Sequence, residues 1–333
     1  MEPLRPSTSW TDLLVSRDQA RAAGRTDAEL RALLSSGRWT ALRRGWYCVT
    51  ADLEAASPAR RFHLELLALH RHLARPHVVV SHGTAGRLHG LRIHRADDVH
   101  RLTDPDRWRN GRGYRMSRAA LPASDVTRLG PFPVTTAART LVDSARELAE
   151  VDAVAALDDA LLRRAVTPDA LHAVLDDARF VRGTPAARRA VARADGRAES
   201  WLETAWRLRH LAAGLPAPQL QVEIWIAGRL VKVVDGWLPE HALAFECDGR
   251  VKYTDPYRGR DPAQVLWAEK RAEDALRAVG IRVVRVVQHD VVDGWAGLAA
   301  RTRRLVAAPV PALDAFRAVP RVAGRVRPQR ASG

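Results

Sequence analysis

Apolar runs and acidic residues alternate most clearly in the last third of the chain. Two apolar runs, Val231–Val234 and Ala242–Phe245, each end in acidic residues, and glycine and proline lie between them. Such runs with a short connection predict a β-hairpin. Because side chains alternate along a strand, Glu246 and Asp248 share one face of it. A bend midway between the runs places Asp235 within about one register step of Glu246.

Three carboxylates, those of Asp235, Glu246 and Asp248, are therefore predicted to converge at the end of a hydrophobic sheet. Crowded carboxylates repel one another and are usually tolerated around a hard cation. This arrangement predicts a magnesium ion, or manganese in its place, as the cofactor. The alternative is two strands that end in solvated acids beside a turn.

Lysine is rare in this chain, and its positions bear on the same stretch. Lysine and arginine together number 53, yet the only lysines are Lys232, Lys252 and Lys270, which flank or follow the acidic hairpin. A compact ammonium with an adjustable pKa does different work in an active site from a guanidinium. Lys252 and Lys270 are therefore candidate catalytic residues.

The first fifty residues predict two short helices followed by a hairpin. Ser16 and Thr26 are candidate N-caps, and a glycine ends each helix. Helix, helix and hairpin is the layout of a winged helix, whose second helix enters a major groove and whose hairpin contacts the DNA backbone. Arg31, Arg43 and Arg44 are the candidate nucleic-acid-binding residues. The alternative is a winged helix that contacts protein, since eight arginines oppose five acids here.

The remaining pattern predicts a mixed α/β (α+β) chain. After the winged helix, strand and helix signals alternate, and a run of helices without a recognisable site follows. The order helix, three strands, helix, strand then predicts the αβββαβ core of a restriction-endonuclease-like fold. The expected domains are a winged helix at 1–55, an α/β region at 56–148, a helical spacer at 149–197, the αβββαβ domain at 198–305 and a basic, disordered tail at 306–333.

The net charge of +15 and the pI near 11.1 predict a polyanionic partner, with DNA as the leading candidate. The alternative is arginine-rich usage without any such partner. No run of about eighteen apolar residues occurs, and the N-terminus lacks the pattern of a signal peptide. We therefore expect a cytoplasmic protein without a membrane partner.

Three resemblances support these predictions. The winged-helix segment, the stretch from Ser81 to His89 and the run VTTAARTLVD (134–143) resemble AbiEi-type antitoxins. The runs FECDGRVKY (245–253) and WAEKRAEDALRAVGIRVVRVV (267–287) resemble the very-short-patch-repair-endonuclease-like domain of actinobacterial proteins. The spacing from Asp235 to Glu246 resembles the PD-(D/E)xK nuclease motif.

The second resemblance implies roles for individual residues. It makes Asp235 and Glu246 metal ligands and places Asp248 where the motif has lysine. Lys252 or Lys270 would replace that lysine. Glu203, or alternatively Glu199, would supply the additional acid often found on the first helix, and Arg271 would contact phosphate or pair with acids on its own helix.

The functional hypothesis is a magnesium-dependent, nuclease-like protein that hydrolyses phosphodiester bonds of DNA. In the alternative, the nuclease fold no longer cuts, and the protein is a DNA-binding regulator or antitoxin with a cognate toxin as partner. A protein-interaction module without nucleic acid is the third class. The first two hypotheses differ in what they make of Asp248, which stands where the nuclease motif has its catalytic lysine. A nuclease needs another lysine in its place, and a regulator does not.

Overall fold

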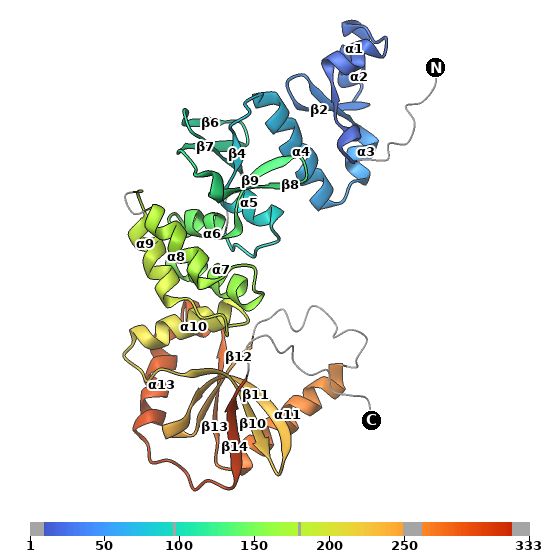
Figure 1. The fold of residues 1–333 in the computed structure, drawn as a ribbon. Coiled ribbons are helices and arrows are strands. Elements are labelled where there is room, and N and C mark those ends of the chain that lie inside the picture. The colour runs from blue at the N-terminus through green and yellow to red at the C-terminus, as the bar shows by residue number, and fades with distance from the viewer. Residues whose placement is uncertain (1–9, 96–97, 179–180, 249–261, 322–333) are drawn as a thin grey trace. The chain divides into compact units, whose positions relative to one another are not determined.

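The computed structural model describes residues 10–95, 98–178, 181–248 and 262–321. The chain divides into two compact units, unit 1 (residues 1–89 and 97–136) and unit 2 (residues 90–96 and 137–333). Within the described ranges there are thirteen α-helices and three sheets, so the fold is a mixed α/β one as predicted (Figure 1). None of the described helices is long and apolar enough to cross a membrane.

Unit 1 begins with two helices and a three-stranded antiparallel sheet in the order β1-β3-β2. The predicted N-caps Ser16 and Thr26 each accept the N–H of the third helical residue, Gln19 or Glu29, whose side chain returns the bond. Helix, helix and hairpin follow one another in the predicted order. The elements are η1 (Trp10–Leu13), β1 (Val15–Ser16), α1 (Arg17–Ala22), α2 (Asp27–Ser35), β2 (Trp39–Arg43) and β3 (Trp46–Val49).

The rest of unit 1 is a six-stranded mixed sheet in the order β6-β7-β5-β4-β9-β8. Leucines of α4 form one buried core with strand residues such as Val80, Leu102 and Val134. The elements are α3 (Thr50–Ala55), α4 (Pro58–Leu73), β4 (Val79–Val80), α5 (His82–Leu88), β5 (His100–Asp104), β6 (Arg109–Gly111), β7 (Tyr114–Arg118), η2 (Ala123–Asp125), β8 (Val126–Leu129) and β9 (Phe132–Thr135).

Unit 2 begins with four helices that share a hydrophobic core of their own, including Leu141, Leu157 and Leu171. The sequence predicted only a spacer over much of this stretch. Small residues on α7 and α9, among them Ala156 and Ala187, are fully or almost fully buried and let these helices pack closely. The helices are α6 (Ala137–Ala145), α7 (Glu150–Leu162), α8 (Pro168–Asp177) and α9 (Thr184–Arg193).

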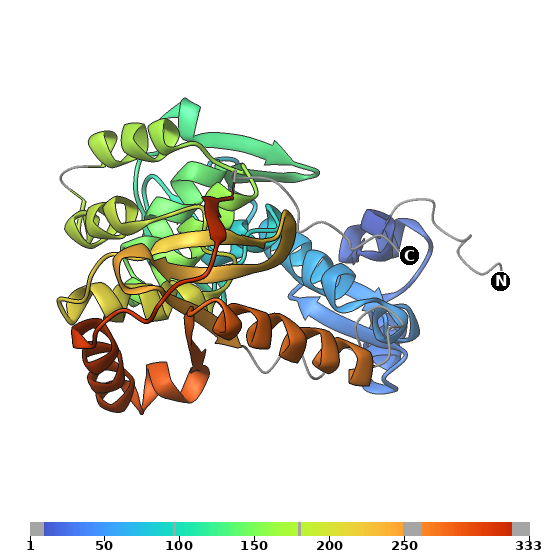
Figure 2. The ribbon, with the colours of Figure 1, turned by 90° about the horizontal axis from the view of Figure 1, so that it is seen from below.

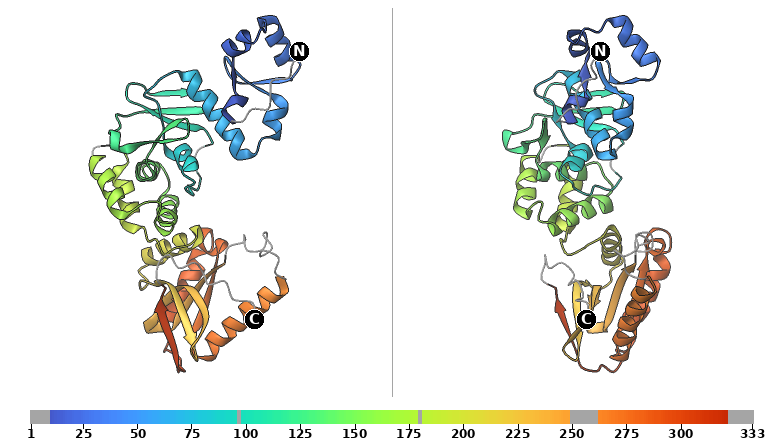
Figure 3. Two further views of the ribbon diagram at one scale, coloured as in Figure 1. Left: turned by 45° about the vertical axis from the view of Figure 1, so that its right-hand side comes forward. Right: turned by 90° about the vertical axis from the view of Figure 1, so that its right-hand side faces the viewer.

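A five-stranded sheet in the order β13-β12-β11-β10-β14 completes unit 2. One face packs on α10, α12 and α13, and the other packs on α11 (Figure 2 and Figure 3). The predicted hairpin is β11 and β12, paired antiparallel through Gly236 and Phe245. The elements are α10 (Trp201–Ala212), β10 (Gln219–Ile226), β11 (Arg229–Leu238), η3 (Pro239–His241), β12 (Leu243–Asp248), α11 (Pro262–Ala278), β13 (Arg282–Val287), α12 (Gln288–Val292), α13 (Trp295–Ala307) and β14 (Phe316–Pro320).

The edge strand β14 corrects the prediction of a disordered tail from residue 306. Phe316–Pro320 pairs antiparallel with β10, and Phe316 meets Trp237 edge-on at 6.0 Å between ring centroids. Arg321 is buried, and its guanidinium donates to Glu199 at 2.7 Å. These contacts order the segment despite its prolines and arginines. They come from residues about a hundred positions earlier, so the local sequence does not predict them.

Candidate functional site

The ladder between β10 and β11 has a register shift between Ile224 and Trp225, and it is also interrupted beside the predicted acids. Pairing continues on both sides, but Gln221 and Asp235, which face each other there, form no ladder pair. Gln221 has a φ of 52°, in the left-handed region that residues other than glycine rarely adopt. Leu220 packs on the α10 side and Val222 on the α11 side, although residues two apart on a regular strand share a face. The strand therefore turns over at Gln221.

This turnover allows the Gln221 amide to bridge two buried carboxylates. Its Nε2 donates to Glu203 Oε2 at 2.9 Å and to Asp235 Oδ1 at 3.2 Å. The other oxygen of Asp235, Oδ2, accepts the backbone N–H of Cys247 at 2.7 Å. Asp235 thus ties together β10, β11 and β12 at the end of their pairing. Each of the two carboxylate residues is 6% exposed.

Glu203 lies in the first turn of α10 and receives further donors from its own N-terminus. The backbone N–H of Glu199 donates to Oε2 at 2.9 Å, and the Ser200 hydroxyl donates to Oε1 at 2.8 Å. Burial raises the pKa of Glu203 well above its ordinary value, and the neighbouring Asp235 charge raises it further. The site therefore favours a protonated Glu203 beside Asp235, a pair suited to proton exchange or to sharing one negative charge.

Glu246 lies nearby but has a different set of partners. Lys232 of β11 forms an ion pair with its Oε2, and both side chains are less than one-fifth exposed. In the ladder between β12 and β13, Glu246 is the register partner of Arg285. Arg285 donates to Glu273 of α11 at 2.6 Å, and Glu273 also pairs with Arg277. Positive and negative side chains therefore alternate on this side of the sheet.

The described part of the chain contains no group of three His, Cys, Asp or Glu side chains that could hold a metal ion. Asp235 is bound by Gln221 and the Cys247 N–H, and Glu246 is bound by Lys232. The sequence predicted a magnesium ion between three carboxylates. The structure instead has the Lys232 ammonium against Glu246 and the Gln221 amide against Asp235. The arrangement does not fit that three-carboxylate site, and the cofactor stays a prediction.

The other predicted catalytic residues are dispersed or lie outside the described ranges. Asp248 is half-buried at the end of β12, aligned with Val287 of β13. Lys252 lies outside the described residues. Lys270 and Arg271 are both exposed on α11, and neither is brought to Asp235 by any described contact.

The predicted DNA-binding residues lie in unit 1. Arg31 is exposed on α2, and its Nε donates to the Asp27 carbonyl at 3.2 Å. Arg43 is half-buried at the end of β2, and Arg44 is exposed in the following turn. Arg31 therefore lies on the second helix, whereas Arg43 ends the first hairpin strand and only Arg44 lies in the turn. Their role in DNA binding stays a prediction.

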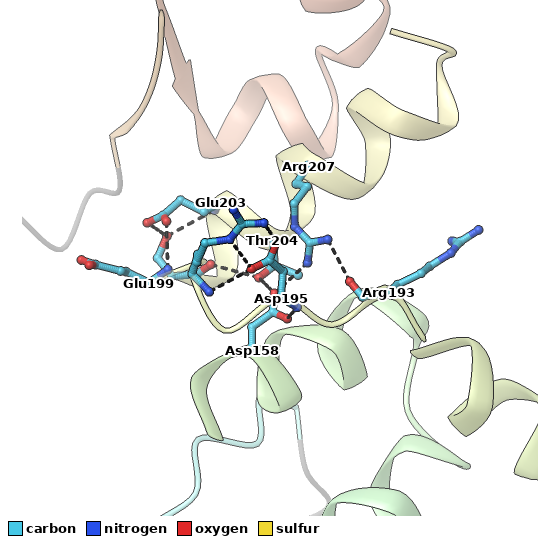
Figure 4. Close-up of polar contacts among 9 residues, drawn as sticks. Asp158, Arg193, Asp195, Glu199, Glu203, Thr204 and Arg207 are labelled. Carbon is cyan, nitrogen blue, oxygen red and sulfur yellow. Dashed lines mark hydrogen bonds and ion pairs between the residues drawn. The ribbon is translucent and has the colours of Figure 1, made fainter. Parts of the chain in front are cut away.

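A buried polar network anchors the helix that carries Glu203 (Figure 4). Asp158 of α7 accepts the Thr204 hydroxyl at 2.7 Å, the Arg207 guanidinium at 2.9 Å and the Asp195 N–H at 2.6 Å. Arg207 also donates to the Arg193 carbonyl at 2.8 Å. Burial raises the pKa of Asp158 to about 6, although these donors favour the charged form. Since Thr204 is adjacent to Glu203, α7 fixes the position of the acid pair.

Sequence reasoning missed the residues that organise this region. Gln221 looked like an ordinary strand residue, and Lys232 was noted only as a flanking lysine. Asp158 did carry a signal, because an acid stands within the apolar run VAALDDALL of α7. Arg207 stands among the buried positions of α10 in the same way. An acid and an arginine at core positions of two helices predict a buried pair between them.

Comparison with known proteins places the chain in a family. Residues 78–191 match the AbiEi antitoxin C-terminal domain. Uncharacterized protein Rv2248 of Mycobacterium tuberculosis (strain ATCC 25618 / H37Rv) is 32% identical over 228 residues, which cover 68% of this chain and 81% of that protein. Uncharacterized protein MT2308 of strain CDC 1551 / Oshkosh gives the same values. This chain belongs to the family of these two mycobacterial proteins.

The antitoxin-domain match extends from β4 to α9, so it includes most of the stretch predicted as a spacer. Asp158 lies inside the matched range and Arg207 outside it, so the buried network joins the antitoxin-like helices to the C-terminal sheet domain of this family member. A crystal structure of RV2827C protein from Mycobacterium tuberculosis is also similar, with a TM-score of 0.41 and 16% identity over 54% of this chain and 71% of that one.

Proposed function

We propose that the protein is a DNA-binding regulator of the antitoxin type, with a cognate toxin protein as its partner. The observation that carries the proposal is the match of residues 78–191 to the AbiEi antitoxin C-terminal domain. The net charge of +15 supports a polyanion as a second partner. The donors that already occupy both oxygens of Asp235 favour a C-terminal domain that does not cut.

The element order supports the finer architecture within this proposal. Helices α1 and α2 followed by the β2–β3 hairpin agree with an N-terminal winged helix, which would read or hold DNA. Helix α10, strands β10 to β12, helix α11 and strand β13 agree with a restriction-endonuclease-like αβββαβ domain. In such a regulator the second domain contributes DNA affinity and not hydrolysis.

Metal-dependent DNA cleavage is the second candidate function. One observation favours it: Lys232 contacts Glu246, and Asp235 and Glu246 each lie one residue beyond the ladder pair Gly236 and Phe245. The acid, acid and lysine of the PD-(D/E)xK motif would then come from adjacent strands. Lys232 of β11 would then replace the motif lysine, whose position Asp248 occupies in this chain. This second function can be tested directly.

The test measures binding and nicking of supercoiled plasmid in magnesium and in manganese. Asp235→Asn and Glu246→Gln are the variants, and Glu240→Gln, which removes an exposed acid from the hairpin connection, is the matched control. Binding without nicking in either metal supports the regulator. Nicking that is lost in both site variants and kept in the control replaces it with the nuclease. No binding to DNA even at low salt would contradict both functions.

A further inference from the structure

We propose that unit 1 contains a phosphate-binding site for the backbone of DNA, formed by Arg43, Arg87 and Arg112 around His100. We call these three arginines the arginine cluster. They come from three separate elements: the end of β2, helix α5 and the turn between β6 and β7. The inference rests on the proposed DNA binding and names a surface for it.

The turn that carries Arg112 lies directly against Arg43. Gly113 has a φ of 70°, and a β-carbon placed on it would stand 3.4 Å from Arg43 Nη2. Glycine thus provides the left-handed turn, and the guanidinium of Arg43 lies at van der Waals distance from it. The backbone N–H of His100 donates to the Gly113 carbonyl at 3.0 Å, so the same turn is tied to the start of β5.

Arg87 approaches this place from α5. Its guanidinium carbon lies 4.1 Å from the centroid of the Phe62 ring, which is within cation–π range. The Phe62 ring in turn lies 5.4 Å from the ring of His100. Phe62 and His100 are buried whereas Arg87 is exposed. The Arg87 guanidinium therefore packs on a buried aromatic ring and stays accessible to solvent.

The charges of the cluster act on one another. Burial lowers the pKa of His100 to about 4, and the positive charges of Arg43 and Arg87 contribute to that lowering. Burial also lowers the pKa of Arg43, and the charge of Arg112 lowers it further. His100 is therefore neutral at physiological pH, and its ring adds no charge of its own.

One carboxylate opposes this positive field. Glu65 favours the charged form of Arg43, but it also pairs with Arg61 at 3.2 Å. Among the interactions described for these residues, the charges of Arg43 and Arg87 both act on His100 and that of Arg112 acts on Arg43, so the guanidinium groups of the cluster repel one another. A bound phosphate relieves this repulsion, just as a cation relieves the repulsion of gathered carboxylates.

Arg43 also has hydrogen-bonding capacity to spare. Its Nε is buried and has no hydrogen-bond partner within the described part of the chain, and its Nη1 makes a long contact of 3.4 Å to the Leu42 carbonyl. A guanidinium has five N–H donors in a fork that matches phosphate. A buried donor without a partner costs stability, so an anion that accepts from it would be held firmly.

The position of the cluster favours DNA over an acidic protein surface. Arg43 ends β2, directly before the hairpin turn that, in a winged helix, contacts the sugar–phosphate backbone. Arg87 and Arg112 extend that contact beyond the hairpin onto α5 and the β6–β7 turn. Evenly spaced phosphates suit arginines that come from several elements, since each can neutralise a phosphate of its own.

The experiment compares two double variants of the full chain that lose the same charge, Arg87→Gln with Arg112→Gln and, as the control in unit 2, Arg188→Gln with Arg189→Gln. Affinity for a fluorescent duplex is measured across a salt series by anisotropy. Two lost phosphate contacts reduce the slope of log K against log salt by about 2 and the affinity about 60-fold near 0.1 M salt. The control should keep most of its affinity and slope.

Each outcome decides one point. If the wild-type protein does not bind duplex at low salt, the proposed function fails. If it binds and the two double variants behave alike, the function stands and the arginine cluster is not the site. Saturable binding of polyglutamate that the cluster variant loses, with DNA affinity unchanged, would assign the cluster to an acidic protein and overturn the inference. If the Arg87→Gln, Arg112→Gln double variant melts at a lower temperature than the wild type, the test is repeated with Arg112→Gln alone, because this position is exposed.

Discussion

At the scale of single residues, Gln221 decides what the acids of unit 2 can do. Its strained φ of 52° allows one amide to hold both Glu203 and Asp235. Strain of this kind persists only where surrounding contacts determine it, and it is often found at functional sites. The Gln221 amide also occupies carboxylate lone pairs of Glu203 and Asp235 that a metal ion would need. The strained backbone therefore supports the proposal of a regulator that does not cut DNA.

Glu203→Gln tests the charge state of this pair. Because the folded pKa of Glu203 is raised above its ordinary 4.5, the folded chain holds the proton longer, and the stability of unit 2 falls as pH rises through that window. Glutamine keeps an acceptor for Gln221 and removes the ionisation. We expect the melting temperature of the wild type to fall between about pH 6 and pH 9, by about 2–4 °C for each kcal/mol lost. The variant should change much less in this window, which lies above the pKa of about 6 of Asp158.

Thermal melts at matched ionic strength provide the measurement, with Glu240→Gln as the exposed control. A variant whose melting temperature follows that of the wild type across the whole pH range would show that Glu203 ionises normally. The raised pKa would then have to be abandoned, together with the protonated pair.

At the scale of elements, α7 and α10 are held by a buried network and not by apolar packing alone. Asp158 accepts from Thr204, Arg207 and the Asp195 N–H, and Trp201 donates at 2.8 Å to Asp152, which lies nearly two turns earlier on α7. The antitoxin-like helices and the first helix of the sheet domain are thereby fixed to each other.

Asp158→Asn should therefore be strongly destabilising. It leaves the buried Arg207 without its counter-charge, which typically costs about 3–5 kcal/mol in the free energy of unfolding. The matched control is Asp176→Asn, which breaks an exposed pair with Arg188 and should cost about 0–1 kcal/mol. Urea unfolding at about pH 8, above the folded pKa of Asp158, gives both values. Equal losses in the two variants would show that the Asp158 charge is not needed at this contact.

Much of the element pattern followed from local sequence, and the reasons are specific. Ser16 and Thr26 were predictable as caps because a capping box needs only residues three apart. The register of the hairpin followed from the alternation that ends at Asp235 and Glu246. In contrast, the turnover at Gln221 and the ion pair between Lys232 and Glu246 depend on neighbouring strands. No short window of sequence contains that information.

At the scale of the whole molecule, the edge strand β14 changes how the basic C-terminus should be studied. Residues 322–333 lie outside the described residues and contain three arginines and no acid. Truncation after Arg321 should preserve the sheet and lower the salt slope of DNA binding by up to about 3. Truncation after Leu305 removes β14 as well and uncovers the edge of β10, so we expect loss of stability or aggregation.

Circular dichroism and light scattering separate the two truncations, and the salt titration measures the slope. An unchanged slope after removal of residues 322–333 would show that these arginines do not meet DNA. A stable, monodisperse protein ending at Leu305 would show that β14 is dispensable.

DNA binding by the full chain is tested most directly by its affinity for duplex DNA as a function of salt concentration. A DNA-binding regulator should bind saturably at about 50 mM salt, with log K falling linearly with log salt by about 0.9 for each phosphate neutralised. If this chain, with its net charge of +15, shows no saturable binding under these conditions, it is not a DNA-binding regulator.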